Sequence, residues 1–236
     1  MRILIVSDLH ANPWALRAVE EDAGRFDHVL CAGDHVSYGP DPAGALAWVR
    51  RHQAIGVRGN HDHAVATGAD PKASPAKQPM ALAMRDWTRA ELEDEDAAFL
   101  VRLPLQLLWE VGGARIAVTH ATPLDALYDY RLKPDAPDAF VNEATATTKA
   151  DFLVLGHTHL PLARAARGLT VVNPGSVGQP LDGDPRAAYA IWEDGRIELR
   201  RAAYDPAPLV AALERLPIDA PLRADLVRMA RTARLG

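Results

Sequence analysis

The sequence predicts an α/β protein with a largely parallel sheet in its first half and antiparallel hairpins in its second half. Over residues 2–60, apolar runs typical of strands buried on both faces alternate with amphipathic helical segments. This alternation implies parallel pairing, with helices on the faces of the sheet. Turns at Gly112–Gly113 and Asp194–Gly195 each join two strand-like segments and therefore predict the hairpins.

Each element follows from a local signal. Asn12 and Asp41 precede a proline and an amphipathic stretch, which is the signature of a capped helix start. Residues 63–80 lose apolar periodicity and predict a loop, whereas residues 81–103 predict a helix. The remaining expected elements are strands at 2–8, 28–34, 54–60, 151–156, 169–175, 187–193 and 196–204, a hairpin over 105–120, a loop over 121–137 and a helix over 137–148.

The chain changes character after Tyr204. Two segments there carry apolar residues at helical spacing, with arginines between them. We therefore expect one domain over residues 1–204 and a C-terminal helical extension over residues 205–236. The extension is expected to pack on the domain or on a twin subunit, and the second arrangement would make the protein a homo-oligomer.

Bulk composition limits the classes of function. The chain has 236 residues, 48% of them hydrophobic, which is enough for one large domain with a sizeable core. A net charge of −5 gives no indication of a nucleic-acid-binding surface. No segment approaches the roughly 18 apolar residues of a membrane span, no signal peptide is visible, and the lone Cys31 fits a reducing compartment. We expect a soluble cytoplasmic protein with no membrane or specific nucleic-acid partner.

Polar side chains that can bind metals follow several of the expected strands. A single histidine after a strand is more often a surface residue, and a single aspartate is often a turn or cap residue. Together they favour a site, because ligands of such sheets bind outside the carboxyl ends of the strands. His35 and His63 adjoin the set and are candidates to line a pocket, whereas His28 and His52 are interpreted as surface residues. The set itself is Asp8, His10, Asp34, Asn60, His61, Asp62, His120, His157 and His159.

The chemistry of these side chains narrows the metal. Carboxylate, imidazole and amide donors without a thiolate suit Mn, Fe, Ni or Zn, and the set is too rich in histidine for calcium or an ordinary magnesium site. Seven ligands exceed the needs of one ion and suggest two, with a shared carboxylate. Two ions roughly 3.5–4 Å apart can clamp both the attacking and the leaving oxygen at phosphorus.

Five short motifs, in this order and spacing, resemble the calcineurin-like metallophosphoesterase superfamily. They are DLH at 8–10, GD at 33–34, GNHD at 59–62, TH at 119–120 and GHTH at 156–159. Each motif is weak alone, but the five together are specific. The stretches GDHVSYGPDP, VRGNHD and VVNPGSVGQP look most like the compact bacterial and archaeal phosphodiesterase branch. The resemblance implies a four-layer α/β/β/α sandwich of two mixed sheets flanked by helices.

The resemblance also implies a role for each matching residue. By resemblance, the first metal is held by Asp8, His10 and His159, and the second by Asn60, His120 and His157. Asp34 would bridge the two metals, His61 would protonate the leaving oxygen, and Asp62 would orient His61. Gly156 is expected to let the backbone turn sharply at the last motif. Mn²⁺ is the expected metal, with Fe, Ni, Zn and Mg as alternatives.

The activity that the resemblance implies is hydrolysis of a small or nucleotide-like phosphodiester by a hydroxide that bridges the two metals. Dinucleoside polyphosphates and phosphomonoesters are alternative substrates. The same fold also serves as a non-catalytic, metal-poor protein-binding scaffold, as in a small retromer subunit. That alternative predicts eroded ligands, whereas all seven are intact here.

One position departs from the superfamily. The Ser/Thr protein phosphatases carry a phosphate-gripping arginine in the loop after the bridging aspartate, where this chain has Tyr38. A tyrosine can donate a hydrogen bond to a phosphoryl oxygen but brings no charge, which disfavours protein-phosphatase activity. Tyr38, Asn60 and Arg58 are the candidate substrate contacts, although a packing or salt-bridge role fits Arg58 equally well. Segments 63–80 and 121–137 are expected to shape the pocket.

Overall fold

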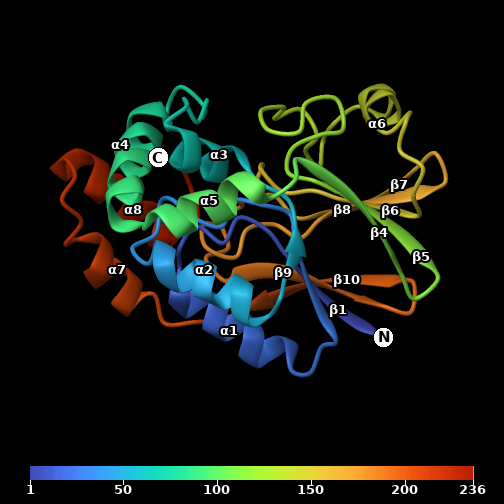
Figure 1. Ribbon diagram of the computed structural model, residues 1–236, viewed down its shortest axis with the longest axis horizontal. Coiled ribbons are helices and arrows are strands. Elements are labelled where there is room, and N and C mark those ends of the chain that lie inside the picture. The colour runs from blue at the N-terminus through green and yellow to red at the C-terminus, as the bar shows by residue number, and fades with distance from the viewer. Residues whose placement is uncertain (236) are drawn as a thin grey trace.

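Two five-stranded mixed sheets form the centre of the protein, as the computed structural model of residues 1–235 shows (Figure 1). The first sheet has the order β10-β9-β1-β2-β3. Its three N-terminal strands pair in parallel, and the C-terminal hairpin adds antiparallel to β1. Its strands are β1 (Arg2–Val6), β2 (His28–Cys31), β3 (Ile55–Gly56), β9 (Ala187–Glu193) and β10 (Arg196–Ala202).

The second sheet has the order β4-β5-β6-β8-β7. The predicted hairpin at Gly112–Gly113 joins β4 to β5, and β5, β6 and β8 pair in parallel. The edge strand β7 was not predicted, because its sequence LARAA lacks both β-branched residues and an apolar run. The strands are β4 (Gln106–Val111), β5 (Ala114–Thr119), β6 (Phe152–Val154), β7 (Leu162–Ala166) and β8 (Leu169–Asn173).

Buried side chains divide the molecule into four layers. Ile5 and Leu30 of the first sheet pack against Val118 and Val154 of the second in a shared core between the sheets. The outer face of the first sheet packs on α1 (Pro13–Ala23) and α2 (Pro42–Arg51), and that of the second packs on α6 (Asp138–Ala144). This arrangement confirms the predicted α/β/β/α sandwich.

The predicted helix starts are confirmed for the first two helices. The side chain of Asn12 accepts a hydrogen bond from the amide of Ala15 at 3.1 Å, and that of Asp41 from the amide of Gly44 at 2.9 Å. These caps satisfy amide groups that have no partner inside a helix. Both helices therefore begin where the polar residue before the proline predicted.

The part of the chain that connects β3 of the first sheet to β4 of the second is more helical than predicted. The expected loop over 63–80 holds the end of α3 (Asn60–Thr67) and the start of α4 (Gln78–Glu91). The expected helix over 81–103 is divided, because Glu93 has an extended backbone and starts a new helix, α5 (Asp94–Arg102). Its acidic first turn suits the positive end of a helix dipole.

The C-terminal extension forms α7 (Ala207–Leu213) and α8 (Ala220–Thr232), which lie at the same end of the molecule as α4 (Figure 1). Leu209, Leu226 and Met229 of these helices share one buried cluster with Met80 and Met84 of α4. The apolar stripe of the extension thus packs within its own chain. The domain boundary after residue 204 stays a prediction. Within residues 1–235, no helix has the length and apolar character needed to cross a membrane.

Candidate metal centre

The polar residues predicted to form a site come together at the edge where the two sheets meet. They follow β1, β2, β5 and β6 or begin α3, and all of them are buried. Five of them have left-handed backbones, an uncommon conformation for residues other than glycine: Asp8 (φ 52°), His10 (φ 43°), Asp34 (φ 55°), His157 (φ 67°) and His159 (φ 59°). Such strain is concentrated at functional sites, where the surrounding fold holds it.

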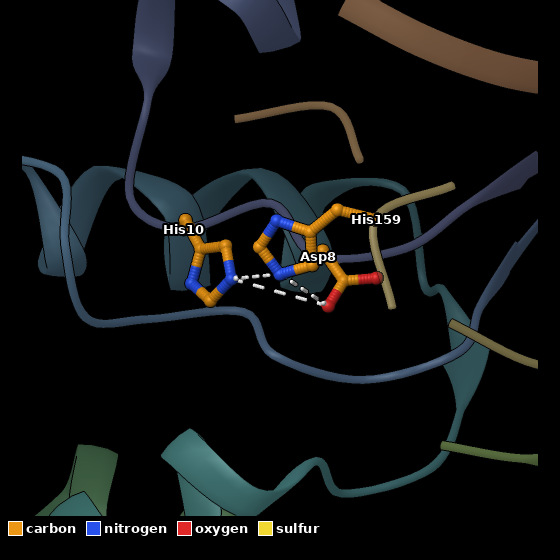
Figure 2. A group of neighbouring side chains, drawn as sticks. All are labelled: Asp8, His10 and His159. Atoms are coloured by element: carbon orange, nitrogen blue, oxygen red, sulfur yellow. Dashed lines mark hydrogen bonds and ion pairs between the residues drawn. The ribbon is translucent and has the colours of Figure 1, made fainter. Parts of the chain in front are cut away.

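The first group consists of Asp8, His10 and His159, whose donor atoms converge (Figure 2). Oδ1 of Asp8 lies 3.3 Å from Nε2 of His159 and 3.9 Å from Nε2 of His10. The two histidine Nε2 atoms are 3.2 Å apart. Three potential ligand atoms therefore face one point.

Backbone carbonyls settle the tautomers of both histidines in this group. Nδ1 of His10 lies 3.2 Å from the carbonyl oxygen of Val36, and Nδ1 of His159 lies 2.5 Å from that of Gln179. A carbonyl oxygen only accepts hydrogen bonds, so each Nδ1 carries the proton of a neutral ring. Both Nε2 atoms then present lone pairs to each other and to a carboxylate, an arrangement that a bound cation would relieve.

The second group consists of Asp34, His120 and His157, with Asn60 beside them. Nδ1 of His120 lies 2.7 Å from the carbonyl oxygen of Ala32 and donates to it, which turns Nε2 toward Oδ1 of Asn60 at 3.0 Å. The amide nitrogen of Asn60 donates to the carbonyl of Pro71, so its oxygen points inward. Nδ1 of His157 lies 3.0 Å from the same oxygen. The donors again converge on one point.

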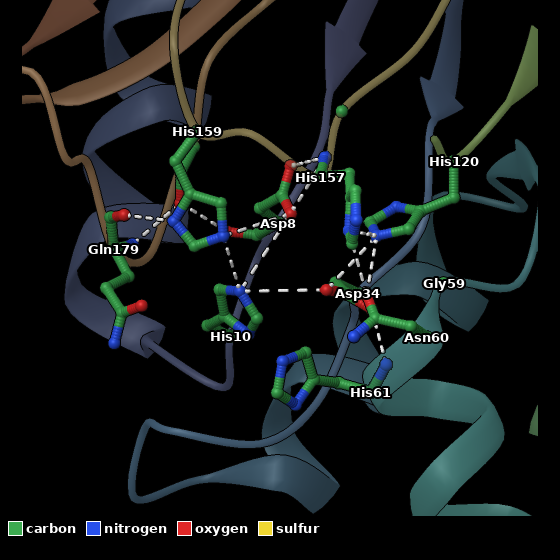
Figure 3. Close-up of polar contacts among 12 residues, drawn as sticks. Asp8, His10, Asp34, Gly59, Asn60, His61, His120, His157, His159 and Gln179 are labelled. Atoms are coloured by element: carbon green, nitrogen blue, oxygen red, sulfur yellow. Dashed lines mark hydrogen bonds and ion pairs between the residues drawn. The ribbon is translucent and has the colours of Figure 1, made fainter. Parts of the chain in front are cut away.

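A single carboxylate reaches both groups. Oδ2 of Asp34 lies 3.2 Å from Nε2 of His120 and 3.9 Å from Nε2 of His10, and Figure 3 shows it between the two groups. Its other oxygen accepts a hydrogen bond from the amide of His61 at 2.9 Å. The oxygen and nitrogen donors, the absence of thiolates among these ligand candidates and the convergence of lone pairs all fit two divalent cations.

Burial dominates the electrostatics of the centre. It lowers the pKa of His10 and of His157 well below the usual value, and neighbouring histidines add to the effect. Burial also lowers the pKa of His120, but the adjacent Asp34 carboxylate outweighs this and raises it to about 9. Burial raises the pKa of Asp34 despite His120. The rings of His10 and His157 are therefore neutral, whereas His120 holds a proton that a bound cation would displace.

The structure corrects the expected role of Asp62. Oδ2 of Asp62 lies 2.7 Å from Nδ1 of His35, and Oδ1 accepts from the amide of His35 at 2.8 Å. Adjacent residues of a helix point in different directions, so Asp62 does not orient the ring of His61. His61 instead presents a buried Nδ1 that has no hydrogen-bond partner in the described part of the chain. Burial, followed by His10 and Lys77, lowers the pKa of His61 well below its usual value.

The candidate substrate contacts separate into two kinds. Tyr38 lines the cavity over the centre, with its ring centroid 4.9 Å from that of His10 and 4.6 Å from that of His61. Asn60 lines the same cavity. Arg58 does not, because its guanidinium donates to the carbonyl of Val101 at 3.0 Å, on the side of α5. Of the two roles considered for Arg58, this contact favours packing over substrate binding.

Sequence reasoning missed several residues of the cavity, which has a volume of about 210 Å³. Lys77 comes from the expected loop 63–80, and Tyr130 and Lys133 come from 121–137, so both segments shape the pocket as predicted. The ring of Tyr130 lies on that of His157, with centroids 3.7 Å apart. His63 is not among the lining residues. A larger hollow of about 780 Å³ lies between α1 and α2 and contains none of the metal-ligand candidates.

The fold and the centre together define a phosphoesterase of the two-metal type. The chain belongs to the calcineurin-like phosphoesterase superfamily, because the model of that superfamily's domain matches residues 1–194. Members of this family depend on two metal ions, in agreement with the two buried ligand groups. The family places the protein among hydrolases of phosphoric esters.

Similar proteins extend over nearly the whole chain. An uncharacterized protein of Methanocaldococcus jannaschii is 31% identical over 223 residues, which are 86% of this chain and 88% of that protein. A metallophosphoesterase from Sphaerobacter thermophilus is 31% identical, and its crystal structure matches with a TM-score of 0.80 over 98% of this chain and 100% of its own. A hypothetical protein from Pyrococcus horikoshii OT3 shares the fold, with 19% identity and a TM-score of 0.83 over 95% of this chain and 97% of its own.

Proposed function

We propose that this protein is a dinuclear metal-dependent phosphodiesterase that hydrolyses a small or nucleotide-like phosphodiester. The observation that carries the proposal is the position of Asp34, which lies within 3.2 Å of His120 and 3.9 Å of His10 and so reaches both ligand groups. Two divalent cations held there would lower the pKa of water and offset charge on the phosphoryl oxygens. Mn²⁺ is the metal that we propose.

The ligands fall into two sets in this proposal. Asp8, His10 and His159 would hold the first metal, and Asn60, His120 and His157 would hold the second. Asp34 would contribute to both sites. The carbonyls of Val36, Gln179 and Ala32 orient the three histidines whose Nδ1 atoms they accept from, because each hydrogen bond fixes both the tautomer and the direction of the ring.

His61 is the residue that we propose to act on the leaving oxygen. Its ring lies beside those of His10 and Tyr38 and faces the cavity, and its Nδ1 is free to donate within the described residues. A phosphate anion in the cavity favours the charged ring and offsets the effect of burial. Proton transfer from a positioned side chain contributes about 10²–10⁴-fold to rate.

A hydrolysis panel tests the proposal. Purified protein with added Mn²⁺, Ni²⁺ or Mg²⁺ should hydrolyse bis(p-nitrophenyl) phosphate faster than p-nitrophenyl phosphate, and Asp34→Asn should abolish both reactions. Cyclic nucleotides and a dinucleoside polyphosphate in the same panel test the substrate class. Preference for the monoester would contradict the proposal, and inactivity with every metal, together with no bound metal, would favour a non-catalytic scaffold.

A second candidate, hydrolysis of dinucleoside polyphosphates or phosphomonoesters, is favoured by one specific observation. Lys77 places an ammonium group in the wall of the cavity. Such substrates carry more negative charge than a simple diester, and a cation at this position would bind them more strongly.

A further inference from the structure

Lys77 is a buried cation with an incomplete set of partners. Its side chain is buried, and its ammonium donates one hydrogen bond, to Oε1 of Gln179 at 3.0 Å. An ammonium group has three donors, and lysine is almost never fully buried without a charged partner. Among residues 1–235, no carboxylate lies within salt-bridge distance of it. The carboxylates of Asp8 and Asp34 act on it only from beyond that distance, so the ammonium has no direct anionic partner among the described residues.

Tyr38 supplies a second unused donor beside it. The Tyr38 hydroxyl is buried and has no hydrogen-bond partner in the described chain, and only 2% of the residue is exposed. Nζ of Lys77 lies 5.1 Å from the centroid of the Tyr38 ring, and both residues line the same cavity. Leaving a buried donor unsatisfied costs about 1–3 kcal/mol, which a bound acceptor would recover.

Gln179 links the Lys77 ammonium to the metal centre. Its backbone oxygen accepts from Nδ1 of His159, and its side-chain oxygen accepts from Lys77 (Figure 3 shows the first contact). The ammonium therefore adjoins the first ligand group without being part of it. Lys133 also lines this cavity and contributes a second positive charge beside that of Lys77.

We infer that Lys77 and Tyr38 form a second anion subsite, which selects substrates that carry another phosphate next to the scissile one. The inference rests on the proposed function and names its substrate class. This class is a phosphate ester with an adjoining phosphate, which the site would prefer to a simple diester with one negative charge. The cavity of about 210 Å³ is many times the roughly 10–15 Å³ that one water needs on the same measure, so it has room for more than one phosphoryl group. Leu160 and Leu181 line the same cavity and offer apolar contacts to the rest of the substrate.

Inorganic pyrophosphate and orthophosphate are the probes that test this subsite. Both are measured as competitive inhibitors of bis(p-nitrophenyl) phosphate hydrolysis with added Mn²⁺. Lys77→Met should weaken inhibition by pyrophosphate by about tenfold or more, as expected for a hydrogen bond between charged groups, and inhibition by orthophosphate by less than about twofold. Tyr38→Phe should weaken pyrophosphate inhibition by about threefold. Pyrophosphate chelates Mn²⁺ to the same extent in every assay. The ratio of the inhibition constants of variant and wild type therefore reports the effect of the substitution alone.

Matched variants separate this role from a structural one. Lys72→Met removes a lysine of the same segment that lies over Tyr128 and does not line the cavity, and it should leave both inhibition constants unchanged. Lys77→Arg keeps the charge and should retain most of the pyrophosphate preference. Thermal melting of each variant shows that it is folded.

Two results would overturn the inference. Equal losses for pyrophosphate and orthophosphate in Lys77→Met would place Lys77 on the scissile phosphate, and no loss for either would leave it a structural residue. Failure of the proposed function looks different, because the wild-type protein would then cleave no phosphodiester. In that case, calorimetric titration of the Mn²⁺-loaded protein with pyrophosphate still tests the subsite. The dissociation constant should rise in Lys77→Met and stay unchanged in Lys72→Met.

Discussion

The ring of His35 and the carboxylate of Asp62 form a buried hydrogen-bonded pair, with Nδ1 and Oδ2 2.7 Å apart. The same carboxylate accepts from the amides of His35 at 2.8 Å and Gly59 at 3.0 Å. These bonds tie the loop after β2, which carries Asp34, to the first turn of α3, which carries Asn60. The pair thus fixes two ligand candidates relative to each other.

We predict that Asp62→Ala destabilises the metal-free protein by about 3–5 kcal/mol, because it removes one partner of a buried charged pair. The free energy of unfolding in urea measures the effect. Glu21→Gln is the control, since Glu21 forms an exposed ion pair with Arg17 and should cost less than about 1 kcal/mol. An equal loss in the free energy of unfolding for the two variants would show that the His35–Asp62 pair does not stabilise the fold more than an exposed ion pair does.

The two histidines of the GHTH motif are predicted to serve different metals. His157→Ala should remove the second ion and His159→Ala the first, because their donor atoms belong to separate groups. Metal content per chain, measured on each single variant and on the double variant, tests this. Each single variant should keep one ion and the double variant neither. If the double variant matched either single variant, both histidines would serve one ion.

His61→Ala should reduce turnover of bis(p-nitrophenyl) phosphate by about 10²–10⁴-fold and leave both metals bound. The reason is that the ring faces the cavity, whereas only its backbone amide contacts the ligand candidate Asp34. Steady-state kinetics and metal analysis on the same sample give the result. Loss of metal from this variant would instead place His61 among the ligands.

Gly156→Ala is predicted to disturb the first ligand group. The expectation that Gly156 gives the backbone a conformation reserved for glycine is wrong, because Gly156 is not in the left-handed region. The positive φ angles of this motif belong to His157 and His159. A Cβ at 156 would instead lie 1.8 Å from Oγ of Ser7 and 2.6 Å from Oδ2 of Asp8. We expect a loss of about 1–3 kcal/mol in stability and a rise of about 10–100-fold in the dissociation constant for the first metal.

The control for this prediction is Gly195→Ala. Gly195 has a φ of 83° and open space around its Cβ position, so the change strains the backbone far from the ligands. It should lower the melting temperature and leave metal affinity unchanged. A metal affinity equal to that of wild type in Gly156→Ala would show that Asp8 tolerates the displacement.

Leu226→Ala should destabilise the protein by about 2–5 kcal/mol, since Leu226 is buried between the C-terminal extension and α4. The melting temperature should not depend on protein concentration, because this contact lies within one chain. Leu108→Ala, at a residue that is 55% exposed, should cost less than about 1 kcal/mol. A concentration-dependent melting temperature would show that the protein associates and would contradict this expectation.

Local signals predicted the fold well where they were strong. Asn12 and Asp41 marked helix starts, and the glycine pair at 112–113 marked a hairpin, since each of these depends on neighbours in the chain. Two features were missed for the opposite reason. The strand Leu162–Ala166 lacks strand propensity and exists because it pairs with β8. The break at Glu93 interrupts a continuous helical pattern.

The candidate site divides in the same way. Its candidate ligands were visible in the sequence, because carboxylate, imidazole and amide side chains that can bind metals recur at the expected strand ends. The partner of Asp62 was not visible, because sequence adjacency suggested His61 whereas the helix turns the two side chains apart. Lys77 gave no signal either, since a lysine in a loop is ordinarily exposed, whereas the fold buries this one beside Tyr38 and Gln179.

The sequence by itself determined the α/β class of the fold and the residue types of a two-metal centre, and its resemblance to a known family added the four layers. Strand patterns and short polar motifs carry that information within a few residues of chain. Only the tertiary structure decided which carbonyl orients each histidine, which residue pairs with Asp62 and which cation borders the cavity. These are contacts between residues such as His159 and Gln179 or Asp34 and His120, which only the packing of the whole chain brings within hydrogen-bond distance.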